Sequence, residues 1–197
     1  MEEISTKASA IQNISSIYSS LTAPCMLDFT NSTKILTLKR NTVLVKEGMY
    51  SKVLYFVIQG SARAFYFRND KDITDWFAFE NEFICSNNSF FENMPSLHSI
   101  ALLEDTILLE MTRDAINALA DKYPDFDRLG RIVITRTMLA LRKRIISIQF
   151  ETAQQKYESL LGIRPKILQR VALTHIASYL GITLETLSRI RNPKNRI

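Results

Sequence analysis

The chain begins with a helical pattern and then changes to a β pattern. Between Ser5 and Leu21 the apolar residues Ile11, Ile14, Tyr18 and Leu21 recur at spacings of 3 and 4, which is typical of one apolar stripe on an amphipathic helix. From Lys34 to about Met111 short runs alternate between apolar and polar residues, with turn residues between them. The predicted strands lie within 34–40, 42–48, 53–60, 61–69, 72–80 and 98–111, and the turn pairs are Glu47-Gly48, Gln59-Gly60, Asn69-Asp70 and Glu104-Asp105. Strands about every ten residues predict an antiparallel barrel or jelly roll.

The pattern returns to helical after the strands. A short helix opens at Thr112, and Pro124 separates it from a long helix over about 126–150. The long helix carries apolar residues at alternating spacings of 4 and 3, which is the heptad pattern of a coiled-coil seam: Ile134, Met138, Leu141, Ile145 and Ile148. We expect two copies to pair through this seam. A second stripe, Leu129, Ile132, Leu139 and Ile146, is predicted to pack against the barrel of the same chain.

The segment from Gln169 to Arg191 has the pattern of a helix-turn-helix. Two amphipathic helices are separated by Gly181, and Thr183 stands at the N-cap position of the second helix. The predicted inward residues are Val171, Ile176, Ala177, Leu180, Ile182, Leu187 and Ile190. The second helix then exposes Leu184, Glu185, Ser188, Arg189 and Asn192. These side chains can reach base edges or phosphates from a major groove, so the motif predicts DNA binding.

Charge is divided unevenly along the 197 residues. From Arg128 onward there are 14 Lys and Arg against 3 Asp and Glu, a balance of +11, whereas residues 1–127 have a balance of −6. A basic half that contains the helix-turn-helix fits a protein that presents one end to the phosphate backbone. We therefore expect an α+β protein with three parts: a β-roll domain with its N-terminal helix (1–125), a dimerisation helix (126–150) and a DNA-binding domain (151–197).

Composition argues against several other classes. No apolar run approaches the ~20 residues of a membrane span and no leader pattern opens the chain, so a cytoplasmic protein without membrane association is expected. Cys25 and Cys85 are the only cysteines, which excludes a disulfide framework or a four-thiolate metal or iron–sulfur site within one chain. The simpler interpretation is that both cysteines are buried free thiols. Redox sensing is the alternative. No cofactor and no metal are expected.

The order of these elements, and several of their residues, resemble the Crp/Fnr superfamily of bacterial transcription regulators. The resemblance rests on residues 55–60 (YFVIQG), 103–106 (LEDT), 176–183 (IASYLGIT) and 185–190 (ETLSRI), and it covers essentially the whole chain. It implies an effector-controlled homodimer that binds a palindromic promoter site, with double-stranded DNA and RNA polymerase as partners.

Where the resemblance implies a nucleotide pocket, the residues depart from the family. Members that bind cyclic nucleotide hold it with a Gly-Glu pair and, about ten residues later, an Arg-Ser or Arg-Thr. Here Cys85-Ser86 and His98-Ser99 stand at those places, so the phosphate-holding guanidinium is absent and cyclic AMP should not bind tightly. The remaining polar candidates for an effector pocket are Cys85, Ser86, Asn87, Asn88, Ser89, His98 and Ser99. They could hold an unknown small molecule or be filled by the protein's own side chains.

The recognition helix and the end of the chain also depart from the family. Many relatives read bases with Arg-Glu-x-x-x-Arg, and here Leu184 replaces the first Arg while Glu185 and Arg189 keep the other two positions. Base readout is predicted for Glu185, Ser188 and Arg189, and backbone contact for Thr174, Thr183, Thr186, Arg191, Lys194 and Arg196. His175 is expected to be structural or phosphate-facing rather than a metal ligand. Only six residues follow Arg191, so no β-wing is expected.

Two other functions remain as alternatives to a DNA-binding regulator. A cupin-type metal enzyme would need several His and carboxylate ligands from neighbouring strands, whereas the predicted barrel contains only His98. A cyclic-nucleotide-binding module of a kinase or channel is opposed by the missing Glu and Arg and by the helix-turn-helix. We therefore do not expect an enzyme.

Overall fold

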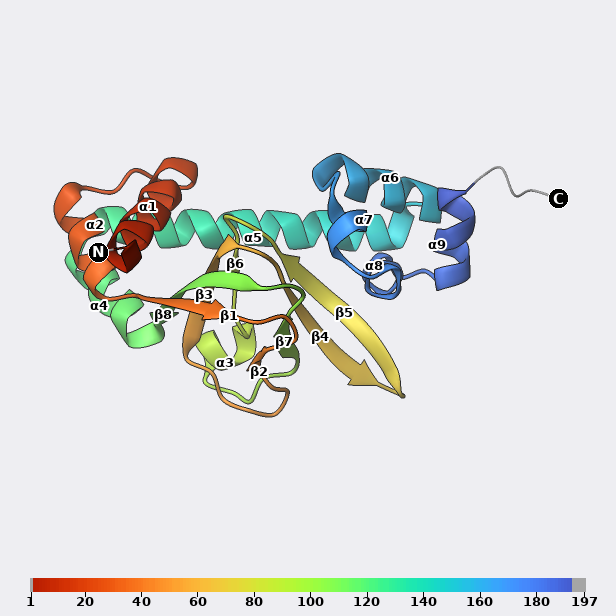
Figure 1. Cartoon of the computed structure of the whole chain (residues 1–197), viewed down its shortest axis with the longest axis horizontal. Helices are drawn as coiled ribbons and strands as arrows, with labels where there is room; N and C mark the ends of the chain where they lie inside the picture. The colour runs from red at the N-terminus through yellow and green to blue at the C-terminus, as the bar shows by residue number, and fades with distance from the viewer. Residues whose placement is uncertain (1, 193–197) are drawn as a thin grey trace.

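The computed structural model describes residues 2–192, with side chains from Ser5 to Asn192 (Figure 1). Its strands are β1 (Lys34–Leu38), β2 (Val43–Val45), β3 (Val53–Gln59), β4 (Ala62–Arg68), β5 (Lys71–Ala78), β6 (Phe83–Ile84), β7 (Ser99–Leu102) and β8 (Thr106–Thr112). They form two four-stranded antiparallel sheets, ordered β1-β8-β3-β6 and β2-β7-β4-β5. The α+β fold with a jelly-roll-like domain is therefore confirmed.

An apolar core between the two sheets holds the β-roll together. Its fully buried members include Val57, Ile100, Leu102 and Leu108. Each fully buried side chain of this size stabilises the fold by about 1.5–3 kcal/mol relative to an exposed one. The alternating apolar runs in the sequence thus correspond to the inward faces of both sheets.

Two of the predicted turns have backbone geometry that explains their residues. Asn69 (φ 51°) and Asp70 (φ 59°) join β4 to β5 in the left-handed region, which a two-residue type I′ hairpin turn requires. Gly60 has φ 99°, and a Cβ at this position would lie 2.4 Å from Thr106 Oγ1 and 2.9 Å from the Asp105 carbonyl oxygen. No larger residue fits there without moving the backbone of the β7–β8 turn.

Helices α1 (Glu2–Ile17), α2 (Ala23–Asn31) and α4 (Arg113–Lys122) form a helical layer at one end of the β-roll (Figure 1). Ile11 and Ile14 are buried as predicted, but α1 ends at Ile17, so Tyr18 and Leu21 follow it rather than continue its stripe. Leu21 is still buried, because its N–H donates to Ser15 Oγ and folds the chain back. The sequence pattern does not indicate α2, β6 or α3 (Asn87–Glu92).

The long helix α5 (Pro124–Phe150) runs from the helical layer, past the β-roll, to the C-terminal helices (Figure 1). Phe126 and Leu129 near its start are buried in the helical layer. The predicted second stripe is wrong beyond that point, since Leu139 and Ile146 are 45% and 44% exposed. The helical layer covers only the first turns of this stripe, because α5 continues beyond it.

The C-terminal module contains α6 (Ala153–Ile163), α7 (Ile167–Arg170), α8 (Leu173–Leu180) and α9 (Leu184–Arg191). Thr152 and Gln155 form a capping box, which explains why a new helix begins so soon after α5 ends. In Figure 1 this module lies at one end of α5. Strand β5 of the β4–β5 hairpin contacts α8 of the module.

Candidate nucleic-acid interface and effector pocket

Helices α8 and α9 form the predicted helix-turn-helix. Gly181 ends α8 in the left-handed conformation (φ 66°), and Thr183 Oγ1 accepts a hydrogen bond of 3.1 Å from the backbone N–H of Thr186. All seven predicted inward residues belong to one apolar cluster, in which Ile176 and Leu187 are fully buried. Tyr157 and Leu160 of α6 also belong to that cluster, as do Phe77 and Phe79 from the β-roll.

The residues predicted to read bases lie on the open face of α9. Glu185, Ser188 and Arg189 are all exposed, and Arg191 is exposed at the end of the helix. Hydrogen bonds from its own backbone N–H and from the Thr183 hydroxyl, with a smaller contribution from Arg189, hold the pKa of Glu185 below its usual range. The carboxylate is thus ionised and can act as a hydrogen-bond acceptor at neutral pH.

The residues predicted to contact the DNA backbone differ in their exposure and in the hydrogen bonds that they already make. Thr174 at the start of α8 is exposed. The hydroxyl groups of Thr183 and Thr186 lie 3.1 Å apart within the N-cap, so both already take part in local hydrogen bonds. Lys194 and Arg196 lie outside the described residues.

His175, on α8, contacts the β-roll. Its Nδ1 lies 3.0 Å from Nη1 of Arg63 in β4. Arg63 is buried and forms an ion pair with Asp72, with 2.8 Å between Nη2 and Oδ2. Burial and the neighbouring Arg63 lower the pKa of His175, although Asp72 partly opposes this effect. The expectation of a structural role therefore fits this geometry, since His175 joins the helix-turn-helix to β4.

Strand β5 forms further contacts with α8. The N–H of Thr74 donates to Ser178 Oγ at 2.9 Å, and that hydroxyl donates to the Asp72 carbonyl at 3.1 Å. Phe77 packs on Tyr179, with 5.1 Å between ring centroids. The sequence did not predict this docking, because the paired residues lie more than 100 positions apart along the chain.

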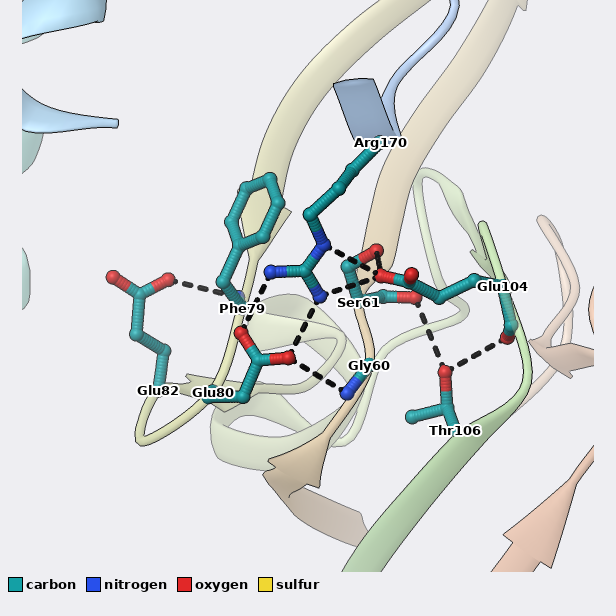
Figure 2. Close-up of polar contacts among 8 residues, drawn as sticks. All are labelled: Gly60, Ser61, Phe79, Glu80, Glu82, Glu104, Thr106 and Arg170. Carbon is teal, nitrogen blue, oxygen red and sulfur yellow. Dashed lines mark hydrogen bonds and ion pairs between the residues drawn. The ribbon is translucent and has the colours of Figure 1, made fainter. Parts of the chain in front are cut away.

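A second set of contacts surrounds Arg170 at the end of α7 (Figure 2). Its guanidinium donates two hydrogen bonds to Glu80, at 2.7 and 2.8 Å, and also bonds Glu104 Oε1 at 2.6 and 3.0 Å. Glu80 follows β5, and Glu104 lies in the β7–β8 turn. Burial alone would raise the pKa of Glu80, but the bonds from Arg170 and from the Gly60 N–H keep it below its usual range.

Arg164 forms a parallel contact beside this cluster. Its Nη2 lies 2.8 Å from both carboxylate oxygens of Glu82, and its guanidinium lies over the Phe79 ring at 4.5 Å. The Arg170 guanidinium lies over the same ring at 5.0 Å. The sequence pattern indicates none of these contacts, because a charged residue gives no sign of which distant residue it will pair with.

The predicted dimer seam is open to solvent along α5. Ile134, Met138 and Ile145 are 55–58% exposed, and Leu141 and Ile148 are also exposed. Monomeric proteins rarely expose a contiguous apolar surface of this kind. In the described chain no element covers the seam, so its apolar side chains are available to a partner.

Arg144 connects α5 to both the hairpin and the helix-turn-helix. Its guanidinium lies 4.1 Å over the Tyr179 ring, and its Nη2 donates to the carbonyl oxygens of Thr74 and Tyr179 at 3.3 and 3.4 Å. The orientation of the module is therefore tied to α5 as well as to the β-roll.

The candidate effector residues lie around β6, α3 and the start of β7, where most of their polar side chains are bonded to other residues of the protein. Ser86 and Ser89 are buried, Ser86 Oγ donates to Ser96 Oγ at 2.7 Å, and Ser89 Oγ accepts from the Ser51 N–H. Ser96 Oγ in turn donates to the His98 carbonyl. Ser96 was not predicted, since an isolated serine in a loop carries no pattern.

The other candidate residues of this region are less buried. Ser99 Oγ accepts from the Glu47 N–H at 3.0 Å, and Asn88 Nδ2 donates to Glu92. Cys85 Sγ donates to Asn87 Oδ1 at 3.4 Å, and both cysteines are free thiols. Burial raises the pKa of Cys85 to about 12, so its thiol is protonated at neutral pH.

His98 is the buried ionisable group of this region. Its Nδ1 lies 3.9 Å from Asp75 Oδ2, and its Nε2 has no hydrogen-bond partner among the described residues. Burial lowers its pKa, while Asp75, the Cys85 carbonyl and Glu47 act in the opposite direction. The ring is therefore neutral at pH 7 and offers no fixed charge for a phosphate.

A cavity of about 290 Å³ lies elsewhere, between α1 and β3. It is lined by Ser5, Thr6, Ser9, Ala10, Asn13, Phe56, Ile58 and Asn81, and none of these belongs to the candidate effector residues. Among residues 2–192 no cluster of three or more His, Cys, Asp or Glu side chains has the geometry to hold a metal ion. No helix in the same range is long and apolar enough to span a bilayer.

Comparisons with known proteins agree with this architecture. The family model of the cyclic nucleotide-binding domain matches residues 35–123, which contain the β-roll. Similar solved structures include FixK2 from Bradyrhizobium japonicum, with 18% identity, a TM-score of 0.68 and coverage of 82% of this chain and 83% of that chain. No curated protein matches the sequence at a significant level.

Two further regulators share the fold. The c-di-GMP responsive global regulator CLP from Xanthomonas campestris has 16% identity and a TM-score of 0.69, with coverage of 88% of this chain and 91% of that chain. The catabolite activator protein from Thermus thermophilus has 19% identity and a TM-score of 0.56, with coverage of 88% and 84%. At these identities the comparison establishes the fold, and the predicted resemblance to Crp/Fnr regulators is confirmed at that level.

Proposed function

We propose that this chain, whose fold is that of the Crp/Fnr regulators, is a homodimeric transcription regulator that binds an inverted-repeat DNA site. The observation that carries the proposal is the position of α9. This helix is fixed from behind by the buried Leu187 and by the Thr183 cap, while Glu185, Ser188 and Arg189 face solvent. A helix held in this way can enter a major groove without rearrangement.

The bases that α9 would read follow from its side chains. Arg189 can pair with the O6 and N7 acceptors of a guanine, and Glu185 can accept from a cytosine amine. Leu184 is 40% exposed at the first turn and could contact a thymine methyl group. The preferred sequence should therefore overlap only in part with that of relatives that have Arg at this position.

The apolar seam of α5 supports the dimer. Pairing two copies would remove Met138, Leu141 and Ile145 from water, and a twofold axis along the seam would place two α9 helices in one complex. Such a dimer requires half-sites whose centres lie about one helical turn apart, ~10 base pairs, or a multiple of it. RNA polymerase is then the expected protein partner at a promoter.

Control by a small molecule is part of the proposal, and its chemistry should differ from that of cyclic AMP. Ser86 and Ser96 already bond each other, and the neutral His98 stands where an Arg would hold phosphate. An effector would have to displace these internal bonds or bind beside them. We propose no cofactor and no catalytic activity.

The test of this function is selection from a random duplex library with the purified protein. We expect an inverted repeat whose affinity falls steeply with salt, because phosphate contacts release counterions. A matched control is the Leu187→Asp variant, in which a charge in the buried face of α9 should abolish selection. Recovery of asymmetric sites, or equal selection by parent and control, would contradict the proposal.

A further inference from the structure

The C-terminal helices are held on the β-roll by several polar contacts, and those named above do not involve α9. They include the contact of His175 and Ser178 with β4 and β5, the Arg170 cluster and the neighbouring Arg164–Glu82 pair. The open face of α9 remains free in this docked arrangement, because Glu185, Ser188 and Arg189 are all exposed. Docking therefore does not block the predicted reading surface.

Arg170 has the most extensive set of bonds between the two parts. Figure 2 shows its guanidinium between Glu80 and Glu104, with the Phe79 ring beside it. A bidentate guanidinium–carboxylate pair fixes direction as well as distance, which a single flexible ion pair does not. Four hydrogen bonds to two carboxylates thus hold the end of α7 in one orientation.

Both carboxylates are themselves held by the β-roll. Glu80 Oε1 accepts from the Gly60 N–H at 2.9 Å, and Glu104 Oε1 accepts from the Ser61 hydroxyl. Gly60 in turn packs against the β7–β8 turn so closely that it has no room for a Cβ. The anchor for Arg170 is consequently a rigid part of the β-roll rather than two mobile surface side chains.

We propose that Arg170, clamped by Glu80 and Glu104, is a positioning residue that fixes the spacing between the two recognition helices of the dimer. This inference rests on the proposed function. Each α9 would be tied through the clamp to its own β-roll and α5. The distance between the two α9 helices of the dimer would then be fixed before binding and would match half-sites at one spacing. Without the clamp each module keeps fewer contacts with the β-roll and gains freedom that it must lose again when it binds, which reduces affinity for the complete site.

The proposal distinguishes positioning from direct DNA contact. Loss of a direct contact weakens binding to a single half-site and to the complete site alike. Loss of positioning weakens binding to the complete site, leaves a single half-site almost unchanged, and allows the protein to accept other spacings. The clamp should therefore affect spacing selectivity rather than base preference.

The test uses a Glu80→Gln, Glu104→Gln double variant, which removes both charges and leaves every residue of the helix-turn-helix intact. Affinity for the selected inverted repeat should fall about tenfold, whereas affinity for one half-site should change less than twofold. Inserting or deleting one base pair between the half-sites should reduce the affinity of the double variant by a smaller factor than it reduces the affinity of the parent. The matched control is Lys39→Gln, which removes the Lys39–Asp105 ion pair within the β-roll and should behave as the parent does. An Arg170→Lys variant, which keeps the charge but loses the bidentate geometry, should fall between parent and double variant.

Hydrogen exchange at the Thr74 amide provides a readout without DNA, because this N–H donates to Ser178 Oγ across the contact between β5 and α8. It should exchange at least tenfold faster in the double variant and at the parental rate in Lys39→Gln. If the parent selects an inverted repeat but spacing tolerance and Thr74 exchange are the same in all variants, the positioning role is wrong and the proposed function stands. If the parent selects no duplex, the proposed function is wrong, while faster Thr74 exchange still supports the clamp.

Discussion

Nη1 of Arg63 lies 3.0 Å from Nδ1 of His175, although 112 positions separate them in the chain. A guanidinium has only donors, so the ring nitrogen must accept and must be unprotonated. Asp72 neutralises Arg63 on its other side. A proton on His175 would remove the acceptor and place two cations in contact, so the protonation state of this histidine is coupled to the docking of the helix-turn-helix.

The first prediction is that His175 makes the fold less stable as the pH falls. Burial and Arg63 lower its pKa in the folded state, with Asp72 opposing, so below about pH 6.5 the unfolded chain takes up a proton that the folded chain resists. The free energy of unfolding should therefore decrease from pH 7.5 toward pH 5. The decrease caused by His175 is complete at pH values below its lowered pKa in the folded state. Urea unfolding at several pH values measures the free energy of unfolding.

The control for this prediction is His175→Asn, whose side-chain carbonyl can still accept from Arg63 without titrating. Its free energy of unfolding should depend less on pH than that of the parent. Part of the pH dependence of the free energy of unfolding will remain in this variant. Burial also lowers the pKa of His98, so His98 too makes the fold less stable as the pH falls. Identical pH profiles for parent and variant would show that His175 is not the coupled group.

The second prediction concerns the α5 seam. A carboxylate in place of Leu141 would be buried without a partner at the interface and would face its own symmetry copy. Leu141→Glu should raise the dimer dissociation constant at least about 100-fold, which corresponds to ~3 kcal/mol. Sedimentation at micromolar concentration should then give monomers, and Arg142→Glu, an exposed neighbour outside the seam, serves as the control. A dimeric Leu141→Glu protein would rule out this seam.

The third prediction is that millimolar cyclic AMP or cyclic GMP does not raise the melting temperature. A ligand at 100 times its Kd stabilises a protein by about 2.7 kcal/mol, so tight binding would be evident in a thermal scan. The neutral His98 provides no fixed charge for a cyclic phosphate, and the Ser86 hydroxyl is already bonded to Ser96. A shift with either nucleotide that disappears in His98→Ala would contradict this reading of the pocket.

The sequence predicted those parts of the fold that depend on local patterns. Alternation identified the long strands, and Gly181 with Thr183 identified the helix-turn-helix, because turns and caps require particular residues at fixed positions. The two-residue strand β6 and the six-residue helix α3 are too short to show any period. They were missed for that reason.

Contacts between distant segments could not be predicted from one sequence. Arg63 follows the alternation of β4 and gives no sign of its burial against α8, and Arg170 is one of many basic residues in the C-terminal half. The open seam was predicted on α5 because a heptad repeat is itself a local pattern. In contrast, the exposure of Leu139 depends on how far the rest of the protein extends along α5. The spacing of apolar residues in the sequence carries no information about that distance.

The last prediction separates base readout from backbone anchoring on α9. Arg189 is exposed, and within the described part of the chain its Nη2 makes one long bond of 3.4 Å, to Thr186 Oγ1. Its guanidinium can therefore turn to a guanine edge at low cost. Arg189→Ala should weaken the binding free energy by ~1–3 kcal/mol per half-site. It should also relax the base preference at one base pair and leave the preferences at the other base pairs unchanged. Arg191→Ala is the matched control, since the same change of charge at a phosphate contact should weaken all sequences alike and flatten the slope of log affinity against log salt by about one. Loss of Lys194 or Arg196 should resemble the control. Selection from a random library with each variant measures both effects, and an Arg189→Ala protein that returns the parental consensus would refute this assignment of roles.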